Sequence, residues 1–343
     1  MFRSPGAPDR VWTSIWQWEM WRFLVYVYRG RSAYPLIVTT LHVEEPSVPA
    51  HTPPMRFAFA TDLHMRGHWV EPLWARFIAR QRVQMCLLGG DFQPEGRRDP
   101  LAVHTGRFFA ELRRHCPELP ILAVLGNHDR GFVLHQLERY GVRVLLDEVA
   151  TLTVAPALRV GIIGVRDPHK SFPRWERIET QLAAHPDVRF WIVLAHSPDV
   201  LLHIPPTAPS MHMILAGHTH GGQICYAPNR PIWHNTRVHR RFAGGLTTYR
   251  AAWVYTSRGL GYTLAPIRIM CPPEIVLCQV VPGAERRVYL REDRFLMDPT
   301  AVRWLGVRRQ EIRRNGPSLS VERTRIGRWH LSRRIRKMLP RRS

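Results

Sequence analysis

Residues 211–223 read MHMILAGHTHGGQ, and this stretch decides the fold class. Its first part, 211–216, is apolar and of strand length, and the next polar side chains are His218, Thr219 and His220. A short run that is apolar throughout is typical of a strand buried on both faces of a layered α/β protein. Ligands of such folds bind beyond the carboxyl ends of the strands, so we expect a site at this edge.

The same arrangement occurs at four earlier apolar runs, 56–61, 83–88, 121–125 and 190–195. Polar motifs follow them directly: D-L-H at 62–64, G-G-D at 89–91, G-N-H-D at 126–129 and H-S-P at 196–198. A further strand is predicted at 159–165, helices at 72–82 and 101–115, and late strands at 252–256, 267–271 and 274–281. This alternation predicts an α/β domain in which five strand ends meet at one site.

The strand ends together offer two carboxylates, an amide oxygen and several imidazoles, but no thiolate. Such a mixture of oxygen and nitrogen donors suits Mn²⁺, Fe or Zn²⁺. The donors are too many for one ion and about right for two ions that share a carboxylate, roughly 3.5–4 Å apart. Two such ions polarise phosphoryl oxygens and activate a water molecule, so the pattern predicts hydrolysis of a phosphoester or a pyrophosphate.

The set D-x-H, G-D, G-N-H-D, H-x-P and G-H-T-H-G-G-Q closely resembles the motifs of the calcineurin-like metallophosphoesterase superfamily, over roughly residues 55–281. The resemblance implies a four-layer α/β/β/α sandwich of two mixed sheets flanked by helices. The later stretches S-R-G-L-G at 257–261 and C-P-P-E-I at 271–275 are similar to one bacterial branch. That branch contains membrane-associated phosphodiesterases, among them a UDP-2,3-diacylglucosamine hydrolase of lipid A synthesis.

The resemblance also implies a role for each motif residue. One ion would be bound by Asp62, His64, Asp91 and His220, and the other by Asp91, Asn127, His196 and His218, with Asp91 as the bridge. His128 would protonate the leaving oxygen or stabilise charge on the phosphoryl group, and Asp129 would orient His128 by a hydrogen bond. We expect Mn²⁺ as the ion, with Fe or Zn²⁺ as alternatives. Substrate contacts are expected from Arg166, Gln223 and Arg258, although Arg166 could instead be a solvated loop charge.

The charge of the chain is concentrated at its C-terminal end. The 343 residues carry a net charge of +22, and residues 301–343 hold 14 arginines or lysines against two acids. Within this part, 325–339 has the spacing of an amphipathic basic helix, which would lie on an anionic bilayer. A helix packed on the domain and a disordered basic tail are the alternatives. The prevalence of arginine fits either a GC-rich genome or selection for contact with phosphate or lipid.

The first 54 residues are expected to form an aromatic segment followed by a linker. Four tryptophans lie at 12, 16, 18 and 21, and they either cover part of the core or lie on a bilayer. The apolar run 23–28 is far shorter than the roughly 20 residues of a spanning helix, and no signal peptide is legible. The Pro-rich stretch 45–54 reads as a linker. We therefore predict three parts: 1–54, the catalytic domain 55–285, and an Arg-rich extension 286–343.

These features predict a peripheral enzyme on the inner face of the cytoplasmic membrane. Its five scattered cysteines fit a reducing compartment and exclude a disulfide-stapled mini-domain. The expected partners are an anionic membrane surface and a lipid-linked phosphodiester or pyrophosphate such as UDP-2,3-diacylglucosamine. The alternative is a soluble phosphodiesterase or nuclease whose basic tail binds nucleic acid. A scaffold without activity is disfavoured because the ligand set is complete.

Overall fold

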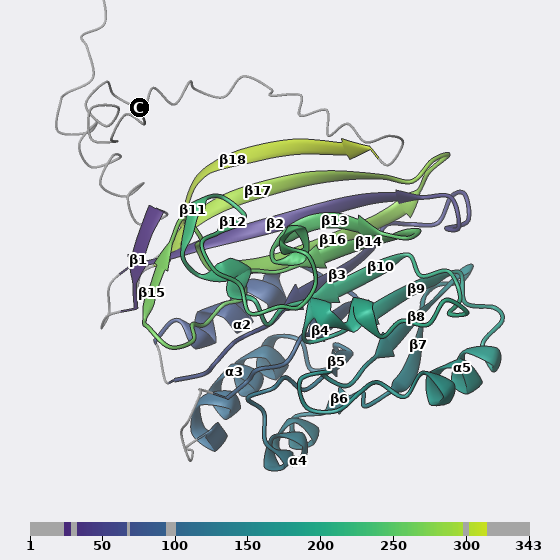
Figure 1. The fold of residues 1–343 in the computed structure, drawn as a ribbon, viewed down its shortest axis with the longest axis horizontal. Coiled ribbons are helices and arrows are strands. Elements are labelled where there is room, and N and C mark those ends of the chain that lie inside the picture. The colour runs from purple at the N-terminus through teal and green to yellow at the C-terminus, as the bar shows by residue number, and fades with distance from the viewer. Residues whose placement is uncertain (1–23, 29–32, 67–68, 94–100, 298–301, 314–343) are drawn as a thin grey trace, which may run out of the picture.

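The computed structural model describes residues 24–28, 33–66, 69–93, 101–297 and 302–313. Two large mixed β-sheets pack face to face, and helices cover the outer face of each (Figure 1). This arrangement confirms the four-layer α/β/β/α prediction.

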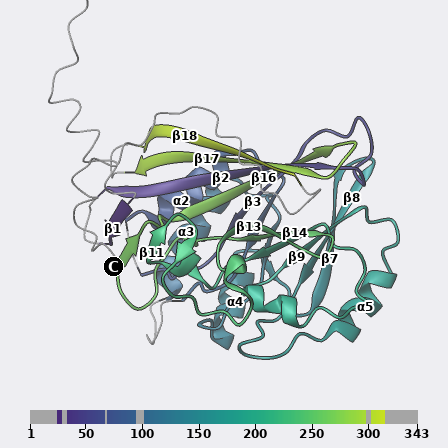
Figure 2. The same ribbon diagram turned by 45° about the horizontal axis from the view of Figure 1, so that its top comes forward.

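The larger sheet has eight strands in the order β18-β17-β2-β16-β3-β4-β5-β6. Its catalytic half consists of four parallel strands, β3 (Met55–Ala60), β4 (Met85–Leu88), β5 (Ile121–Ala123) and β6 (Val142–Val144). Its other half consists of β16 (Glu274–Pro282), β2 (Tyr34–Glu45), β17 (Arg287–Met297) and β18 (Val302–Arg313). Figure 2 shows β18, β17 and β2 side by side along the upper edge of the molecule.

The second sheet has six strands in the order β13-β14-β10-β9-β8-β7. The four central strands are parallel: β14 (Ala252–Thr256), β10 (Met213–Ala216), β9 (Phe190–Leu194) and β8 (Leu158–Gly164). The antiparallel edges are β13 (Gly245–Tyr249) and β7 (Glu148–Ala155). Two short pairs complete the strands, β11 (Cys225–Ala227) with β12 (Arg230–Pro231), and β1 (Val25–Val27) with β15 (Ile267–Ile269).

Three separate hydrophobic cores lie between these layers, and the side chains of β3 alternate between two of them. Phe57 and Phe59 face the six-stranded sheet, whereas Ala58 and Ala60 face the helices. Those helices are α2 (Glu71–Arg80), α3 (Leu101–His115) and α4 (Gly131–Arg139). The outer face of the six-stranded sheet is covered by α5 (Trp175–Ala183) and the 3₁₀ turns η1 (Pro198–Leu202) and η3 (Arg240–Phe242). Burial on both faces explains why the parallel strands read as unbroken apolar runs.

The predicted domain boundaries at 54 and 285 are wrong, because both flanking parts contribute strands to the large sheet. β2 lies between β16 and β17, and β17 continues the sheet beyond residue 286. The Pro-rich stretch 45–54 therefore connects two strands of one domain. The sequence analysis did not predict β17, whose sequence is RVYLREDRFLM. Its alternation of buried and exposed residues is not visible in the sequence, because some of its charged residues are buried and paired in the fold, such as Glu292 with Arg258.

The N-terminal aromatics are partly placed. Tyr26 and Tyr28 are buried against Tyr34 in the core beneath the helices, as one of the two predicted alternatives requires. The tryptophans at 12–21 and the predicted basic helix at 325–339 lie outside the described residues. No helix in the described part of the chain is long and apolar enough to span a membrane.

Candidate metal centre

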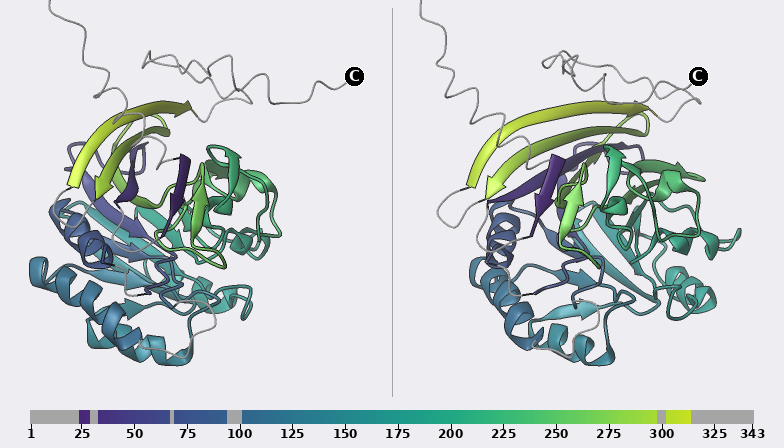
Figure 3. Two further views of the ribbon diagram at one scale, coloured as in Figure 1. Left: turned by 90° about the vertical axis from the view of Figure 1, so that its left-hand side faces the viewer. Right: turned by 60° about the vertical axis from the view of Figure 1, so that its left-hand side comes forward.

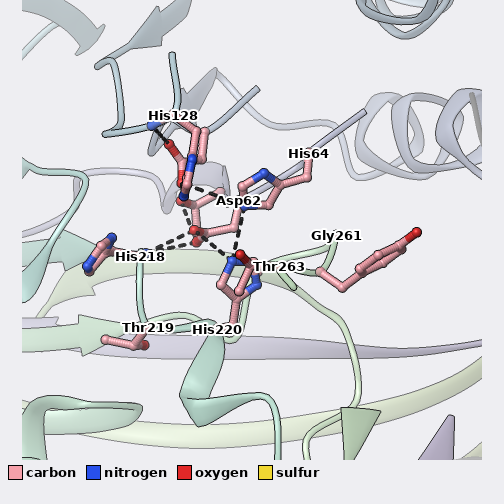
Figure 4. A network of polar contacts seen from close by, with 12 residues as sticks. Asp62, His64, His128, His218, Thr219, His220, Gly261 and Thr263 are labelled. Atoms are coloured by element: carbon pink, nitrogen blue, oxygen red, sulfur yellow. Dashed lines mark hydrogen bonds and ion pairs between the residues drawn. The ribbon is translucent and has the colours of Figure 1, made fainter. Parts of the chain in front are cut away.

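The strand ends of both sheets converge on one buried site (Figure 4). Asp62 and His64 follow β3, Asp91 follows β4, and Asn127 follows β5; His196 follows β9, and His218 and His220 follow β10. Six of these residues form two compact groups whose ligand atoms lie within 4.8 Å of one another: Asp62 with His64 and His220, and Asp91 with His196 and His218.

Asp91 faces both groups. Its Oδ2 lies 3.3 Å from His196 Nε2 in its own group and 3.6 Å from His64 Nε2 in the other. Asn127 joins the second group, since its Oδ1 lies 2.8 Å from His218 Nδ1 and 3.0 Å from His196 Nε2. This is the geometry in which one carboxylate can bridge two ions.

Backbone carbonyls fix the tautomers of three histidines. His64 Nδ1 and His196 Nδ1 donate to the carbonyls of Gln93 and Gly89, at 2.7 and 2.8 Å. His218 uses Nε2 in the same way, 3.3 Å from the Asn235 carbonyl. When each ring is neutral, its opposite nitrogen faces the site without a proton, as a metal ligand requires. The donor set therefore fits bound cations.

Burial sets the charge state of the site. It lowers the pKa of His64 to about 4 and that of His218 to about 3, so both rings are neutral near pH 7. Burial also raises the pKa of Asp62 to about 7. At His196 burial opposes the charged form, but Asp91 raises the pKa well above its usual value. The carboxylates thus create a position where positive charge is stabilised, which suits a cation.

The ligands sit on strained backbone. Asp62, His64 and Asp91 have φ values of 51°, 40° and 54°, a region that residues other than glycine rarely adopt. Neighbouring glycines leave room for the carboxylates: a Cβ on Gly217 would lie 2.4 Å from Asp62 Oδ2, and one on Gly126 only 2.2 Å from Asp91 Oδ1. Strain of this kind persists where the surrounding fold over-determines it, which is typical of functional sites.

Comparison with known proteins agrees with this geometry. A family model described as calcineurin-like phosphoesterase matches residues 55–222, which contain every predicted ligand. Residues 55–222 of the chain belong to the calcineurin-like metallophosphoesterase superfamily. The protein is therefore a metal-dependent phosphoester hydrolase, as the motifs predicted.

Several bacterial proteins resemble this metallophosphoesterase. Phosphodiesterase YaeI of Escherichia coli is 27% identical over 66% of this chain and 83% of its own length. The uncharacterized metallophosphoesterase YkoQ of Bacillus subtilis is 24% identical over 75% of this chain and 96% of its own. Among solved structures, a dimetal phosphatase of Danio rerio aligns at 12% identity and a TM-score of 0.37, covering 74% of this chain and 99% of that one.

His128 lies at the solvent side of the metallophosphoesterase site. Its backbone N–H donates to Asp91 Oδ1 at 2.9 Å, and its Nε2 lies 4.0 Å from Asp91 Oδ2. The side chain is 24% exposed, whereas those of His64 and His196 are fully buried. His128 is thus accessible from solvent, unlike the rings of His64 and His196.

The predicted role of Asp129 is corrected by the structure. Its carboxylate accepts four backbone hydrogen bonds, from the N–H groups of Asp91 (2.8 Å), Phe92 (2.8 Å), Gln93 (3.2 Å) and Gly126 (2.9 Å). These bonds join the loop after β4 to the loop after β5. Asp129 therefore positions the loops that carry Asp91 and Asn127, and it does not orient the His128 ring.

Two of the three predicted substrate contacts, Arg258 and Gln223, are corrected as well. Arg258 is 5% exposed and forms a buried ion pair with both Glu274 and Glu292. The Gln223 carboxamide is buried and bonds the backbone of Thr263 and Ala265, so it holds a loop. The Arg166 guanidinium lies 3.1 Å from Asp147, whose other oxygen accepts the Arg166 N–H. The polar groups of Arg258 and Gln223 therefore serve the fold, whereas the Arg166 side chain is 32% exposed and its contact with a substrate stays a prediction.

Two residues of the site were not predicted. The His169 ring lies 4.3 Å from that of His218, and its Nε2 lies 3.2 Å from Asp199. Its position after β8 is the same strand-end signal that identified the ligands. Arg268 is 1% exposed, donates to the carbonyls of Gly261 and Cys271, and lies 3.3 Å from His220 Nδ1. No sequence signal marks it, because an arginine between two isoleucines normally faces solvent.

Proposed function

We propose that this metallophosphoesterase hydrolyses a phosphodiester or pyrophosphate bond in a lipid-linked substrate. The most specific candidate for this substrate is UDP-2,3-diacylglucosamine. The observation that carries the reaction class is the pair of donor groups with Asp91 facing both. Bound divalent cations supply polarisation of the phosphoryl oxygens and a water of lowered pKa. Mn²⁺ is the proposed ion because the donors are oxygen and nitrogen without a thiolate.

The residues of the chain would hold the ions and protonate the leaving oxygen. Asp62, His64 and His220 would hold one ion, and Asn127, His196 and His218 would hold the other, with Asp91 shared. Water adds its oxygen to phosphorus opposite the leaving oxygen and loses one proton to solvent, and the bond from phosphorus to the leaving oxygen breaks. His128 gives its Nε2 proton to the departing oxygen. Cleavage of UDP-2,3-diacylglucosamine in this way releases UMP and 2,3-diacylglucosamine 1-phosphate.

A lipid-linked substrate is supported by three features. The segment before β1 carries four tryptophans, which favour a membrane interface. No aspartate or glutamate occurs between Asp199 and Glu274, a stretch that includes His218 and His220 and is suited to an anionic substrate. The similar Escherichia coli protein is named a phosphodiesterase. The inner face of the cytoplasmic membrane is the proposed location, since five free cysteines fit a reducing compartment.

A substrate panel tests this function. Purified protein with Mn²⁺ would be given bis(4-nitrophenyl) phosphate, a cyclic nucleotide, a single-stranded oligonucleotide, and UDP-2,3-diacylglucosamine in detergent, with Asp91→Asn as the inactive control. We expect kcat/KM for the lipid substrate to exceed that for the soluble esters by roughly tenfold or more, because remote binding energy lowers the barrier. Preference for the oligonucleotide would instead establish the nuclease alternative.

A further inference from the structure

Four short chain segments form a small sheet beside the metal site. β1 pairs antiparallel with β15, so that Val25 lies opposite Ile269 and Val27 opposite Ile267. Ile224 bridges Ile269 on the other side, and the Ile232 N–H donates to the Ile224 carbonyl at 3.0 Å. Figure 3 shows β1 and β15 side by side, apart from the helices.

The outer face of this sheet is apolar, although it is the face turned to solvent. Its inner face carries Tyr26, Cys225 and Arg268, which are only 6%, 2% and 1% exposed. Its outer face carries aliphatic side chains on every strand, which we call the apolar sheet face: Val25, Val27, Ile224, Ile232, Ile267 and Ile269. A sheet with one solvated face normally places polar residues there.

Exposure of this face is high. Val25 and Val27 are each 43% exposed and Ile232 is 69% exposed. Three more exposed side chains border the face: Tyr226, Trp233 and Leu264. These six account for more than half of the large hydrophobic residues that are exposed in the described part of the chain. A contiguous exposed apolar patch marks an interaction site.

The charge next to the face indicates what it contacts. The hairpin and the loop that follows it expose Arg230, Arg237, Arg240 and Arg241. No acidic residue lies between Asp199 and Glu274 to balance them. A second copy of the chain would bring these arginines against each other across a symmetric contact. Aliphatic and aromatic side chains with arginines on the adjoining hairpin and loop instead match an anionic lipid surface, to which each basic residue adds attraction.

We propose that the apolar sheet face docks on an anionic lipid bilayer and sets the metal site at the bilayer surface. The sheet is joined to the site at two points. Asn235, three residues after Ile232, contacts His218, and Arg268, on the inner face of β15, contacts His220. Docking would therefore bring a lipid headgroup close to the ligands, a step that rests on the proposed function.

Vesicle co-sedimentation of the full-length protein tests the docking. The double variant Val27→Glu/Ile232→Glu places two charges on the face, and its matched control, Val302→Glu/Trp304→Glu, changes side chains that are 43% and 55% exposed on β18. We expect wild type and control to pellet with vesicles of phosphatidylcholine and phosphatidylglycerol. Binding of the double variant should fall by about tenfold or more.

Folding and catalysis are checked on the same samples. Circular dichroism and hydrolysis of bis(4-nitrophenyl) phosphate should be unchanged in the double variant, because its substituted side chains face solvent. Undiminished vesicle binding by the double variant, an equal loss in the control, or no binding by wild type would each overturn the docking proposal. A lower melting temperature with intact vesicle binding would also overturn it, by showing that protein covers the face. Sedimentation needs no turnover, so failure of the proposed function would leave this result unaffected.

Discussion

The two large sheets contribute different chemistry to the same site. The eight-stranded sheet supplies the oxygen ligands, Asp62, Asp91 and Asn127, each directly beyond a parallel strand. The six-stranded sheet supplies imidazoles alone, His196, His218 and His220. Each donor group nevertheless takes members from both sheets. The negative charge that attracts a cation thus comes from one layer, and the other layer completes the coordination.

The largest effect should come from removing that charge. Asp91→Asn keeps the shape of the side chain but removes the carboxylate that faces both groups, so we expect hydrolysis of a soluble phosphodiester to fall by about a thousandfold or more. Metal content, measured on the purified protein, should fall with it. His196→Ala removes one neutral donor and should cost less. An equal loss in the two variants would contradict the division of roles between the sheets.

His128→Ala should have a smaller effect of a different kind. Turnover should fall by roughly a hundredfold, the range of a lost general acid, because protonation of the leaving oxygen is no longer assisted. Metal content should stay at the wild-type value, since His128 Nε2 lies farther from Asp91 Oδ2 than His196 Nε2 does. Loss of metal would mean that His128 is a ligand.

Removal of metal should weaken the contact between the sheets. At a free ion concentration of 100 times its Kd, each bound ion adds about 3 kcal/mol to the free energy of unfolding. Chelation should therefore lower Tm by about 4 °C for each ion. Calorimetry of wild type with Mn²⁺ and after treatment with a chelator measures this difference. Asp91→Asn, whose sites no longer bind, is the control and should show little change. If the Tm of the wild type were the same with Mn²⁺ and after chelation, cations would not stabilise the contact between the two sheets.

The smallest effect concerns His212, at the start of β10 and outside the ligand set. Its Nδ1 accepts the Trp191 N–H at 3.1 Å, and burial lowers its pKa to about 4. The unfolded chain, with a pKa near 6.5, binds this proton first as pH falls, so stability should decrease between about pH 6.5 and 4, by roughly 3 kcal/mol. His212→Gln should flatten the pH dependence of unfolding by urea. If the free energy of unfolding depended on pH in the same way in the wild type and in His212→Gln, His212 would not be the group that titrates.

Sequence patterns predicted that these side chains meet at one site, because each lies within a few residues of a strand end and ligands of α/β folds bind there. Their assignment to one or the other of two metal ions came from the resemblance to the metallophosphoesterase motifs. Asp129 and Gln223 were misassigned because their partners are backbone groups, which leave no mark in the sequence. β2 and β17 were missed for a related reason. Their neighbours are distant in sequence, and the charges on β17 look solvated until Arg258 is seen beside Glu292.

The place of β2 between two C-terminal strands has a consequence for biosynthesis. Every metal ligand has been translated once the ribosome passes His220, but β3, which carries Asp62 at its end, pairs on one side with β16, which ends only at Pro282. Until then that edge of β3 has no partner strand, and β2 cannot yet pair with β16 or β17. Such long-range pairing slows folding and leaves a nascent chain open to aggregation. The catalytic residues are therefore all translated before the strands that fix their geometry. A truncation shortly after His220 should give an inactive protein that requires chaperones to stay in solution.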